Sequence, residues 1–319
     1  MVEITRERME LLYKAQKNSF SCTIVICIIG TFISTILYVI GEDMQGSYRS
    51  VILLISFAFF IIPIIYTVIS FKKFIPPGNG KIVRAAFQNM RYDFLSDKTV
   101  NMLFESIGKA ANYADKTMLT LYLCDVYLFR GQINEAISLI NSIDRSMFVH
   151  YPTIGMTFYE EVMSIYSVIE DNNSVIAAFA DGEKFIDECA FRNYLCCSKA
   201  VGGLIMYEEA RGNYRSALQL LLMRNEFENN IERDNRNSGS VLNHPLAQFS
   251  RGIVFINTAE LYYLCGDLWE AGQSLDIGGP MVASCPFMLN RANTLSAKIR
   301  QAKAEQYNNV NRSETQGQQ

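Results

Sequence analysis

The side chains of this chain that are best suited to nucleophilic or metal chemistry are two histidines and eight cysteines. Histidine is the commonest general base, but His150 and His244 lie next to a proline or one residue from it, in segments typical of loops. No Cys-x-x-Cys pair occurs, and no cysteine lies at metal-ligand spacing from a histidine. The motifs of phosphate loops, dinucleotide sites, zinc proteases and nucleophile elbows are missing. We therefore predict no catalytic residue, metal site or cofactor, and leave an unfamiliar cysteine–histidine pair as the alternative.

The cysteines fit a packing role better than a reactive one. Cys22 and Cys27 fall inside an apolar run, and the adjacent Cys196 and Cys197 would point to different faces of a helix. In a reducing compartment these side chains would stay thiols. We expect them to be small core residues.

Residues 151–190 carry eight carboxylates against one base, Lys184. Glu160 and Glu161 are adjacent, and adjacent side chains diverge on a helix, so spacing alone does not make them a catalytic pair. A solvated helix face is our preferred interpretation of this acidic run, and a docking surface for a basic partner is the alternative. The formal net charge of −3 argues against broad attraction to nucleic acid.

Two apolar runs, 20–40 and 51–71, contain no charged residue and are separated by a short loop, 41–50. At 1.5 Å of rise per residue, each run would make a helix of about 31 Å, which is close to the thickness of the hydrocarbon layer. We predict a transmembrane hairpin over 20–71. A cleaved signal peptide and buried helices of a soluble protein are the alternatives.

Positive charge flanks the two runs on their outer ends, whereas the loop between them has only Arg49 beside two acids. The flanking bases are Arg6, Arg8, Lys14, Lys17, Lys72, Lys73, Lys81 and Arg84. Because basic flanks stay on the cytoplasmic side, we predict that both termini are cytoplasmic, including segment 1–19, and that loop 41–50 lies outside. Organelle-targeting features are absent, which favours a bacterial inner membrane.

A break at 72–80, with two prolines and two glycines, predicts a linker between the hairpin and the rest of the chain. Beyond it, apolar residues recur at helical spacing, and two-residue alternation is not sustained. We predict an all-α domain of about nine to eleven helices over 81–306. The polar stretch 229–245 is predicted to be a flexible insertion, and the tail 307–319 to be disordered.

Three segments of this domain share one pattern. They are 123–140 (LCDVYLFRGQINEAISLI), 204–221 (LIMYEEARGNYRSALQLL) and 258–275 (TAELYYLCGDLWEAGQSL). In each, a glycine precedes an alanine by five positions, as in Gly131 and Ala136, Gly212 and Ala217, and Gly266 and Ala271. Glycine permits a tight turn, and alanine lets the second helix approach the first. The pattern resembles a degenerate tetratricopeptide repeat (TPR).

The resemblance implies an α-solenoid whose stacked helical hairpins form a groove for a segment of another protein. The clamp by which chaperone-binding members hold a terminal carboxylate is not matched here, because Asp125, Met206 and Glu260 stand among its positions. The resemblance therefore implies an apolar to acidic groove. Its candidate partner-binding residues are Tyr122, Asp125, Phe129, Met206, Glu209, Glu260 and Tyr263.

These features predict a membrane-anchored scaffold or adaptor whose cytoplasmic TPR-like array recruits a partner protein to the bilayer. The expected partners are proteins and, through the hairpin, lipid; nucleic acid and a small-molecule substrate are not expected. The alternative is an accessory or regulatory subunit of a membrane transport or envelope complex, in which the hairpin makes the key contacts. We expect no enzyme activity, and keep an enzyme of unfamiliar type as a third hypothesis.

Overall fold

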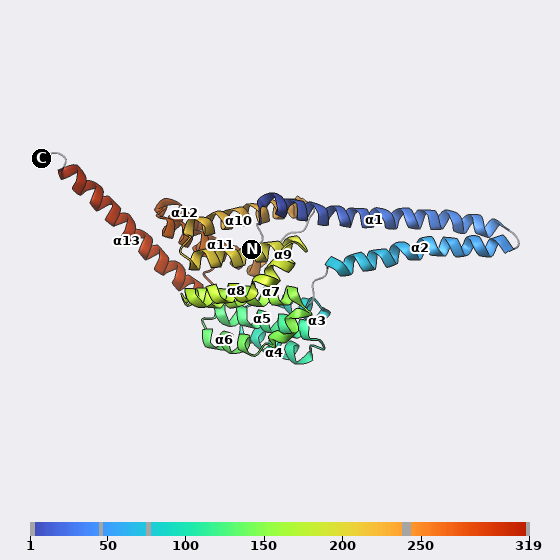
Figure 1. The fold of residues 1–319 in the computed structure, drawn as a ribbon, viewed down its shortest axis with the longest axis horizontal. Helices are drawn as coiled ribbons and strands as arrows, with labels where there is room; N and C mark the ends of the chain where they lie inside the picture. The colour runs from blue at the N-terminus through green and yellow to red at the C-terminus, as the bar shows by residue number, and fades with distance from the viewer. Residues whose placement is uncertain (1–3, 45–46, 75–77, 238–243, 317–319) are drawn as a thin grey trace.

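The computed structural model describes residues 4–44, 47–74, 78–237 and 244–316. Every regular element in these ranges is a helix, and none is a strand. The expectation of an all-α chain is therefore confirmed. Figure 1 shows a helical body from which a two-helix hairpin projects on one side and a single long helix, α13, on the other.

Helices α1 (Arg6–Asp43) and α2 (Ser47–Phe74) form the projecting hairpin (Figure 1). Both are long and apolar enough to cross a membrane, over Thr23–Asp43 and Tyr48–Ile65, and only 11% of each span is buried inside the protein. The connection is shorter than the predicted loop 41–50, because the helices continue into it from both sides.

Small side chains seat the two hairpin helices against each other. The hydroxyl groups of Ser34 and Ser56 lie 3.2 Å apart, and Ser56 Oγ also donates to the Ser34 carbonyl oxygen at 2.8 Å. A Cβ on Gly30 would lie 2.4 Å from Cγ of Pro63, so only glycine permits this approach. Interhelical contacts of this type hold helix pairs together in lipid.

The first turns of α1 pack on the body and do not form a separate segment. The side chain of Met9 is fully buried, and the Tyr13 ring makes edge contacts with Tyr194 and Phe227 at 5.8 and 6.2 Å. Arg6 Nη1 lies 2.9 Å from Glu226 Oε2. Because Thr5 caps α1 and the helix then runs unbroken into the span, the hairpin is tied to the body by a continuous helix.

Eleven α-helices follow the hairpin in the described part of the body, at the upper end of the predicted range. They are α3 (Lys81–Met90), α4 (Asp97–Lys109), α5 (Tyr113–Phe129), α6 (Ile133–Asn141), α7 (Pro152–Val168), α8 (Asn172–Cys189), α9 (Tyr194–Ala210), α10 (Tyr214–Asn237), α11 (Pro245–Cys265), α12 (Leu268–Met281) and α13 (Pro286–Gln316), with a 3-10 helix η1 (Arg145–Val149) before α7. Consecutive helices pack as the pairs α5/α6, α7/α8, α9/α10 and α11/α12.

The turn glycines behave as the repeat pattern predicts. Gly131, Gly212 and Gly266 have φ angles of 73°, 78° and 86°, the left-handed region that L side chains avoid. They end α5, α9 and α11, and the alanine five residues later is fully buried in each case. In the pair α7/α8 the turn is made by Glu170, at a φ of 58°.

The last helices of the body pack back on the first ones. The ring of Phe249 in α11 lies 4.6 Å from that of Phe94 and 5.1 Å from that of Phe129. The Cys285 thiol lies 3.0 Å from the Phe129 carbonyl oxygen. The buried residues of α3 to α5 and α11 to α13 thus form one hydrophobic cluster, and a second cluster joins the start of α1 to α5 through α10. The first and last helices of the body are therefore in contact with each other.

Two segments expected to lack structure are helical. Helix α10 runs to Asn237 through much of the insertion predicted at 229–245, whose residues 238–243 lie outside the described residues. Helix α13 runs to Gln316, so the prediction of a disordered tail from residue 307 is corrected as far as Gln316 (Figure 1). Segment 307–316 lacks apolar periodicity, but it also lacks glycine and proline, and it continues the stretch 297–306, whose Ala, Lys, Gln and Glu residues favour helix.

The break predicted at 72–80 separates α2 from α3. Pro76 and Pro77 lie outside the described residues, whereas Gly78 takes a φ of 77° and Gly80 caps α3. The Gly80 amide donates to Asp115 Oδ1 at 3.0 Å, which fixes the entry of the chain into the body.

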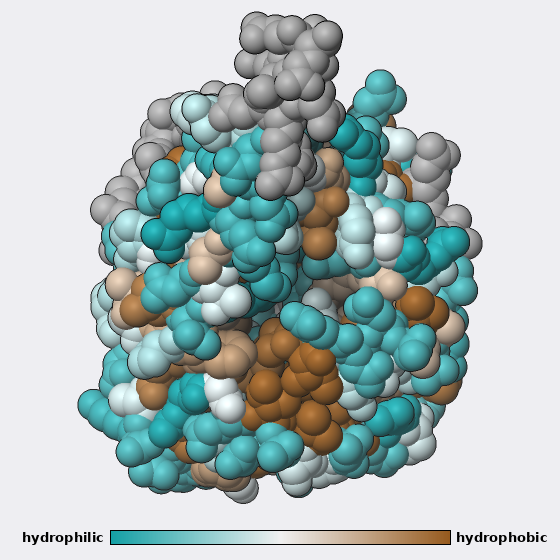
Figure 2. Space-filling view, turned by 90° about the vertical axis from the view of Figure 1, so that its left-hand side faces the viewer, coloured by the Kyte–Doolittle hydropathy of each residue, from teal (hydrophilic) through white to brown (hydrophobic). Residues whose placement is uncertain are grey.

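On the face of the body away from the hairpin, Figure 2 shows a mostly hydrophilic surface around one contiguous apolar area.

Candidate functional site

The inner sides of α5, α7, α9, α10, α11 and α13 enclose a cavity of about 360 Å³, which we call the central cavity. A neighbouring cavity of about 270 Å³ shares part of its wall. The shared residues are Ser167, Val168, Met206, Glu209, Glu260 and Arg291. The two cavities therefore form one polar cleft that continues from the centre of the body toward α8.

Five of the seven candidate partner-binding residues line the central cavity: Asp125, Phe129, Met206, Glu209 and Glu260. The other two do not. The Tyr122 ring packs 5.8 Å from Phe87, and Tyr263 packs against the cluster formed by the first and last helices. Their contacts are those of packing residues.

Helical spacing explains why the cavity residues converge. Asp125 and Phe129 are four residues apart on α5, and Met206 and Glu209 are three apart on α9, so each pair shares a helix face. The repeated pairing of helices then turns those faces toward one another.

Eight of the side chains that line the central cavity are charged. Its carboxylates are Asp125, Glu160, Glu161, Glu209 and Glu260, and its bases are Lys199, Arg224 and Arg291. Each base already has an acidic partner. Lys199 Nζ lies 2.9 Å from Glu160 Oε2, Arg291 pairs with Glu260, and Arg224 Nε donates to Glu228 Oε1 at 3.0 Å.

Asp125 and Glu161 are left as neighbouring carboxylates without an ion-pair partner among the described residues. Burial is the main cause that raises the pKa of Asp125 to about 6, and the shift is opposed first by hydrogen bonding with Glu161 and then by Lys199. Burial, followed by the nearby Asp125 carboxylate, raises the pKa of Glu161 well above its usual range. Because two buried carboxylates this close do not both ionise readily, the pair retains a proton near neutral pH.

Glu161 is the most deeply buried of the carboxylates at this cavity. The residue is 9% exposed, and its Oε1 has no hydrogen-bond partner. Burial also raises the pKa of Glu209 to about 7, with a further contribution from Glu260 and an opposing one from Arg291. For Lys199, burial opposes the charged form, but Glu160, Asp125 and Glu161 together raise its pKa.

Gly202 gives two of these side chains room to cross α9. A Cβ at this position would lie 2.8 Å from Arg224 Nη1 and 2.9 Å from Glu160 Oε1. Any larger side chain at Gly202 would push both charged groups and would enter the central cavity.

This chain matches no protein-family model, and it has no match among curated proteins or solved structures. The function must therefore be argued from its own geometry.

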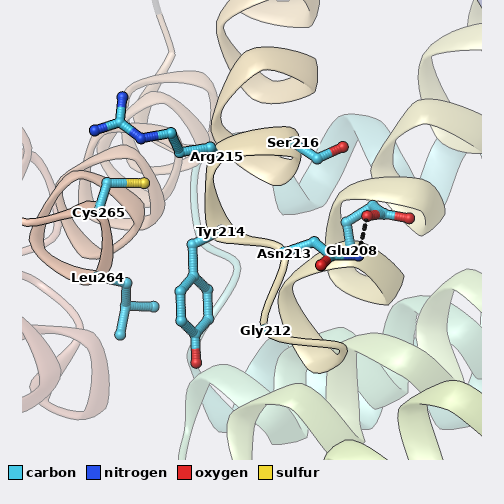
Figure 3. A pocket seen from close by; sticks show the side chains of 8 residues that line it. All are labelled: Glu208, Gly212, Asn213, Tyr214, Arg215, Ser216, Leu264 and Cys265. Carbon is cyan, nitrogen blue, oxygen red and sulfur yellow. Dashed lines mark hydrogen bonds between the residues drawn. The ribbon is translucent and has the colours of Figure 1, made fainter.

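A second depression, of about 490 Å³, lies at the turn between α9 and α10 and the end of α11 (Figure 3). Tyr214 and Leu264 lie side by side there, and Asn213 Nδ2 donates to Glu208 Oε2 at 2.8 Å (Figure 3). The amide and the carboxylate of this open surface site already satisfy each other. It makes a weaker binding site than the central cavity.

His244 and three of the buried cysteines have structural roles in the described part of the chain. His244 caps α11, its Nδ1 accepting from the Ala247 amide at 3.1 Å, as expected of a capping histidine. Burial raises the pKa of Cys124, Cys196 and Cys197, which makes these thiols poor nucleophiles. No group of three or more His, Cys, Asp or Glu side chains within the described ranges could hold a metal ion.

Sequence reasoning missed the other charged residues of the central cavity. They are Glu160, Glu161, Lys199, Arg224 and Arg291. The acidic run was interpreted as a solvated face, and for Glu161 that interpretation is wrong. A signal was present: Phe158 and Ile165, three residues before and four after Glu161, are both fully buried and mark a core stripe on which a carboxylate is unusual.

Proposed function

We propose that this chain is a membrane-anchored scaffold or adaptor whose TPR-like helical array binds a segment of a partner protein in the central cavity. The observation that carries the proposal is the convergence of six helices, from α5 to α13, on one polar cavity, with charged groups held at its wall. Concave sites between stacked helical hairpins are surfaces on which such arrays grip other proteins.

The repeat character rests on local geometry. Three helix pairs turn at a glycine with positive φ and then bury an alanine at the same spacing. The contact between the first and last helices departs from an open solenoid. An enclosed cavity of about 360 Å³ fits a few side chains of a peptide better than a long helix.

The anchor supports recruitment to a bilayer. Two apolar helices project from the body, and the first turns of α1 pack on α9 and α10. That packing supports an arrangement in which the N-terminus and the body lie on the same side of a membrane spanned by the hairpin. Together with the basic flanks, it supports cytoplasmic termini.

The experiment is affinity purification of the full chain from its own membranes, with two matched variants. Gly202→Leu fills the central cavity, whereas Gly108→Leu adds the same side chain at a helical glycine with no atom within 4 Å of its Cβ. A partner recovered with the native chain and Gly108→Leu, but lost with Gly202→Leu, supports the proposal. Circular dichroism of both variants verifies that they fold.

Replacement of the hairpin by an unrelated two-helix anchor separates the alternative. Loss of the partner in that chimaera alone would assign function to the hairpin, as in an accessory subunit of a membrane complex. If no protein is recovered with the native chain, the scaffold proposal is wrong.

A further inference from the structure

Two buried hydrogen-bond acceptors of the central cavity lack donors. Four buried side-chain atoms in the described residues have no hydrogen-bond partner, and two of them, Glu161 Oε1 and Asn257 Oδ1, line this one cavity. They come from α7 and α11, which are far apart in the chain. Leaving a buried acceptor unpaired costs about 1 to 3 kcal/mol, and more when the group is charged. A ligand with N–H donors would satisfy both atoms.

The charge distribution favours a positively charged ligand. The bases at the wall are already engaged with Glu160, Glu228 and Glu260. Asp125, Glu161 and Glu209 are left without ion pairs among the described residues, so an anion would meet uncompensated carboxylates there. A cation would find them unpaired, and hydrogen bonds to ionised carboxylates are stronger than those between neutral groups.

The rest of the wall suits an organic cation. Leu128, Ile205, Leu261 and Phe287 also line the central cavity and would contact an alkyl stem. No three metal-ligating side chains come together in the described parts of the chain, so a bare metal ion lacks a coordination sphere. An ammonium or guanidinium group on an apolar stem, as in lysine or arginine, fits both features.

We propose that the central cavity binds an alkylammonium or alkylguanidinium group, whose N–H groups donate to Glu161 Oε1 and Asn257 Oδ1 beside Asp125. The inference rests on the proposed function, because it names the group that a partner would insert. It adds a site and a ligand class to the scaffold.

Binding is coupled to the loss of a proton. The pair Asp125 and Glu161 retains a proton near neutral pH because burial raises the pKa of both groups. A bound cation favours the ionised pair, so the proton leaves to the buffer while the cation takes its place. Affinity should therefore rise between pH 5.5 and pH 8. The other charged groups at the cavity are Glu160 on α7, Lys199 and Glu209 on α9, Arg224 on α10, Glu260 on α11 and Arg291 on α13.

The test is titration calorimetry of the full chain in phosphatidylcholine nanodiscs at pH 7, with empty nanodiscs as the blank. The probes are n-butylammonium, n-butylguanidinium, neutral 1-butanol and anionic butyrate. Two buffers of different ionisation enthalpy report the number of protons released. We expect the two cations to bind with release of up to about one proton, and the alcohol and butyrate to bind at least tenfold more weakly.

The decisive variant is Glu161→Gln, which keeps the shape of the side chain and removes its charge. It should weaken cation binding at least tenfold and abolish proton release, whereas Glu135→Gln, at an exposed carboxylate of α6, should change neither. Equal binding of 1-butanol, preferred binding of butyrate, or unchanged cation binding in a folded Glu161→Gln variant would overturn the inference.

Blocked peptides that differ only in a central lysine, arginine or norleucine identify the source of the cation. Tighter binding of the lysine or arginine peptide than of butylammonium assigns the site to a protein side chain, and equal or tighter binding of the free amine assigns it to a small molecule. A partner that is lost with Gly202→Leu but retained with Glu161→Gln would contradict the cation site and support the scaffold proposal. Cation binding by a chain that recovers no partner protein would support the cation site and contradict the scaffold proposal.

Discussion

Replacement of Glu209 by glutamine should stabilise the protein at pH 8 and leave its stability almost unchanged at pH 4.5. In the folded protein, burial and the nearby Glu260 carboxylate raise the pKa of Glu209 from 4.5 to about 7. Between these two values the folded state holds a proton that the unfolded state has lost. The free energy of unfolding contributed by Glu209 therefore falls as the pH rises through this window.

The magnitude follows from the size of the shift. Each unit of pKa corresponds to about 1.4 kcal/mol, so ionisation of Glu209 costs the folded state roughly 3 kcal/mol by pH 8. Glutamine does not titrate, so the folded state of the variant does not lose this free energy as the pH rises. The gain in unfolding free energy of Glu209→Gln over the native chain should grow from near zero at pH 4.5 to roughly 3 kcal/mol at pH 8.

The assay is urea unfolding of the full chain in nanodiscs, followed by tryptophan fluorescence and circular dichroism. Circular dichroism is the main readout, because Trp269, the single tryptophan of the sequence, is 66% exposed on α12 in the folded protein. Glu135→Gln is the control, with a pH-independent effect expected. The same gain at pH 4.5 and pH 8, or a gain below about 1 kcal/mol at pH 8, would refute the electrostatic argument.

Two further predictions concern the fold. Gly266→Ala should lower the unfolding free energy by about 1 to 2 kcal/mol through backbone strain alone, since no atom lies within 4 Å of its Cβ. The control Gly108→Ala, in α4, should raise the unfolding free energy by about 0.5 to 1 kcal/mol. Equal effects of the two substitutions in urea unfolding would contradict the left-handed turn. Met9→Ala should lower the unfolding free energy by about 2 to 5 kcal/mol, because the side chain is fully buried against the body. The control Leu11→Ala, at an exposed position, should change the unfolding free energy by no more than about 0.5 kcal/mol. Equal effects of the two substitutions would mean that α1 does not pack there.

Local features of the chain were accessible from sequence. Turn glycines such as Gly266 depend only on a backbone conformation within a few residues, so composition and spacing suffice to predict them. The resemblance to a tetratricopeptide repeat, whose inner positions recur with helical periodicity, implied that Asp125, Met206 and Glu209 line a groove. Tyr122 and Tyr263 share that periodicity but pack elsewhere, because aromatic side chains at a helical spacing serve core and groove equally well.

The ends of the helices were less predictable. A lack of apolar periodicity from residue 307 indicates that a segment does not pack, which is a different property from being unstructured. Helix α13 continues to Gln316 because no glycine or proline interrupts it after its packed part, and the stretch 297–306 is rich in strong helix formers.

The sequence by itself determined the two long apolar helices, the all-α body and the repeated glycine turns, because each depends on neighbours within one or two turns of helix. Only the tertiary structure decided three other features: the packing of Phe249 on Phe94, the burial of Met9, and the unpaired Glu161 beside Asp125. Each of these brings together residues that are far apart in the chain. The burial that raises the pKa of Glu161 is a property of the assembled helices, and no local pattern encodes it.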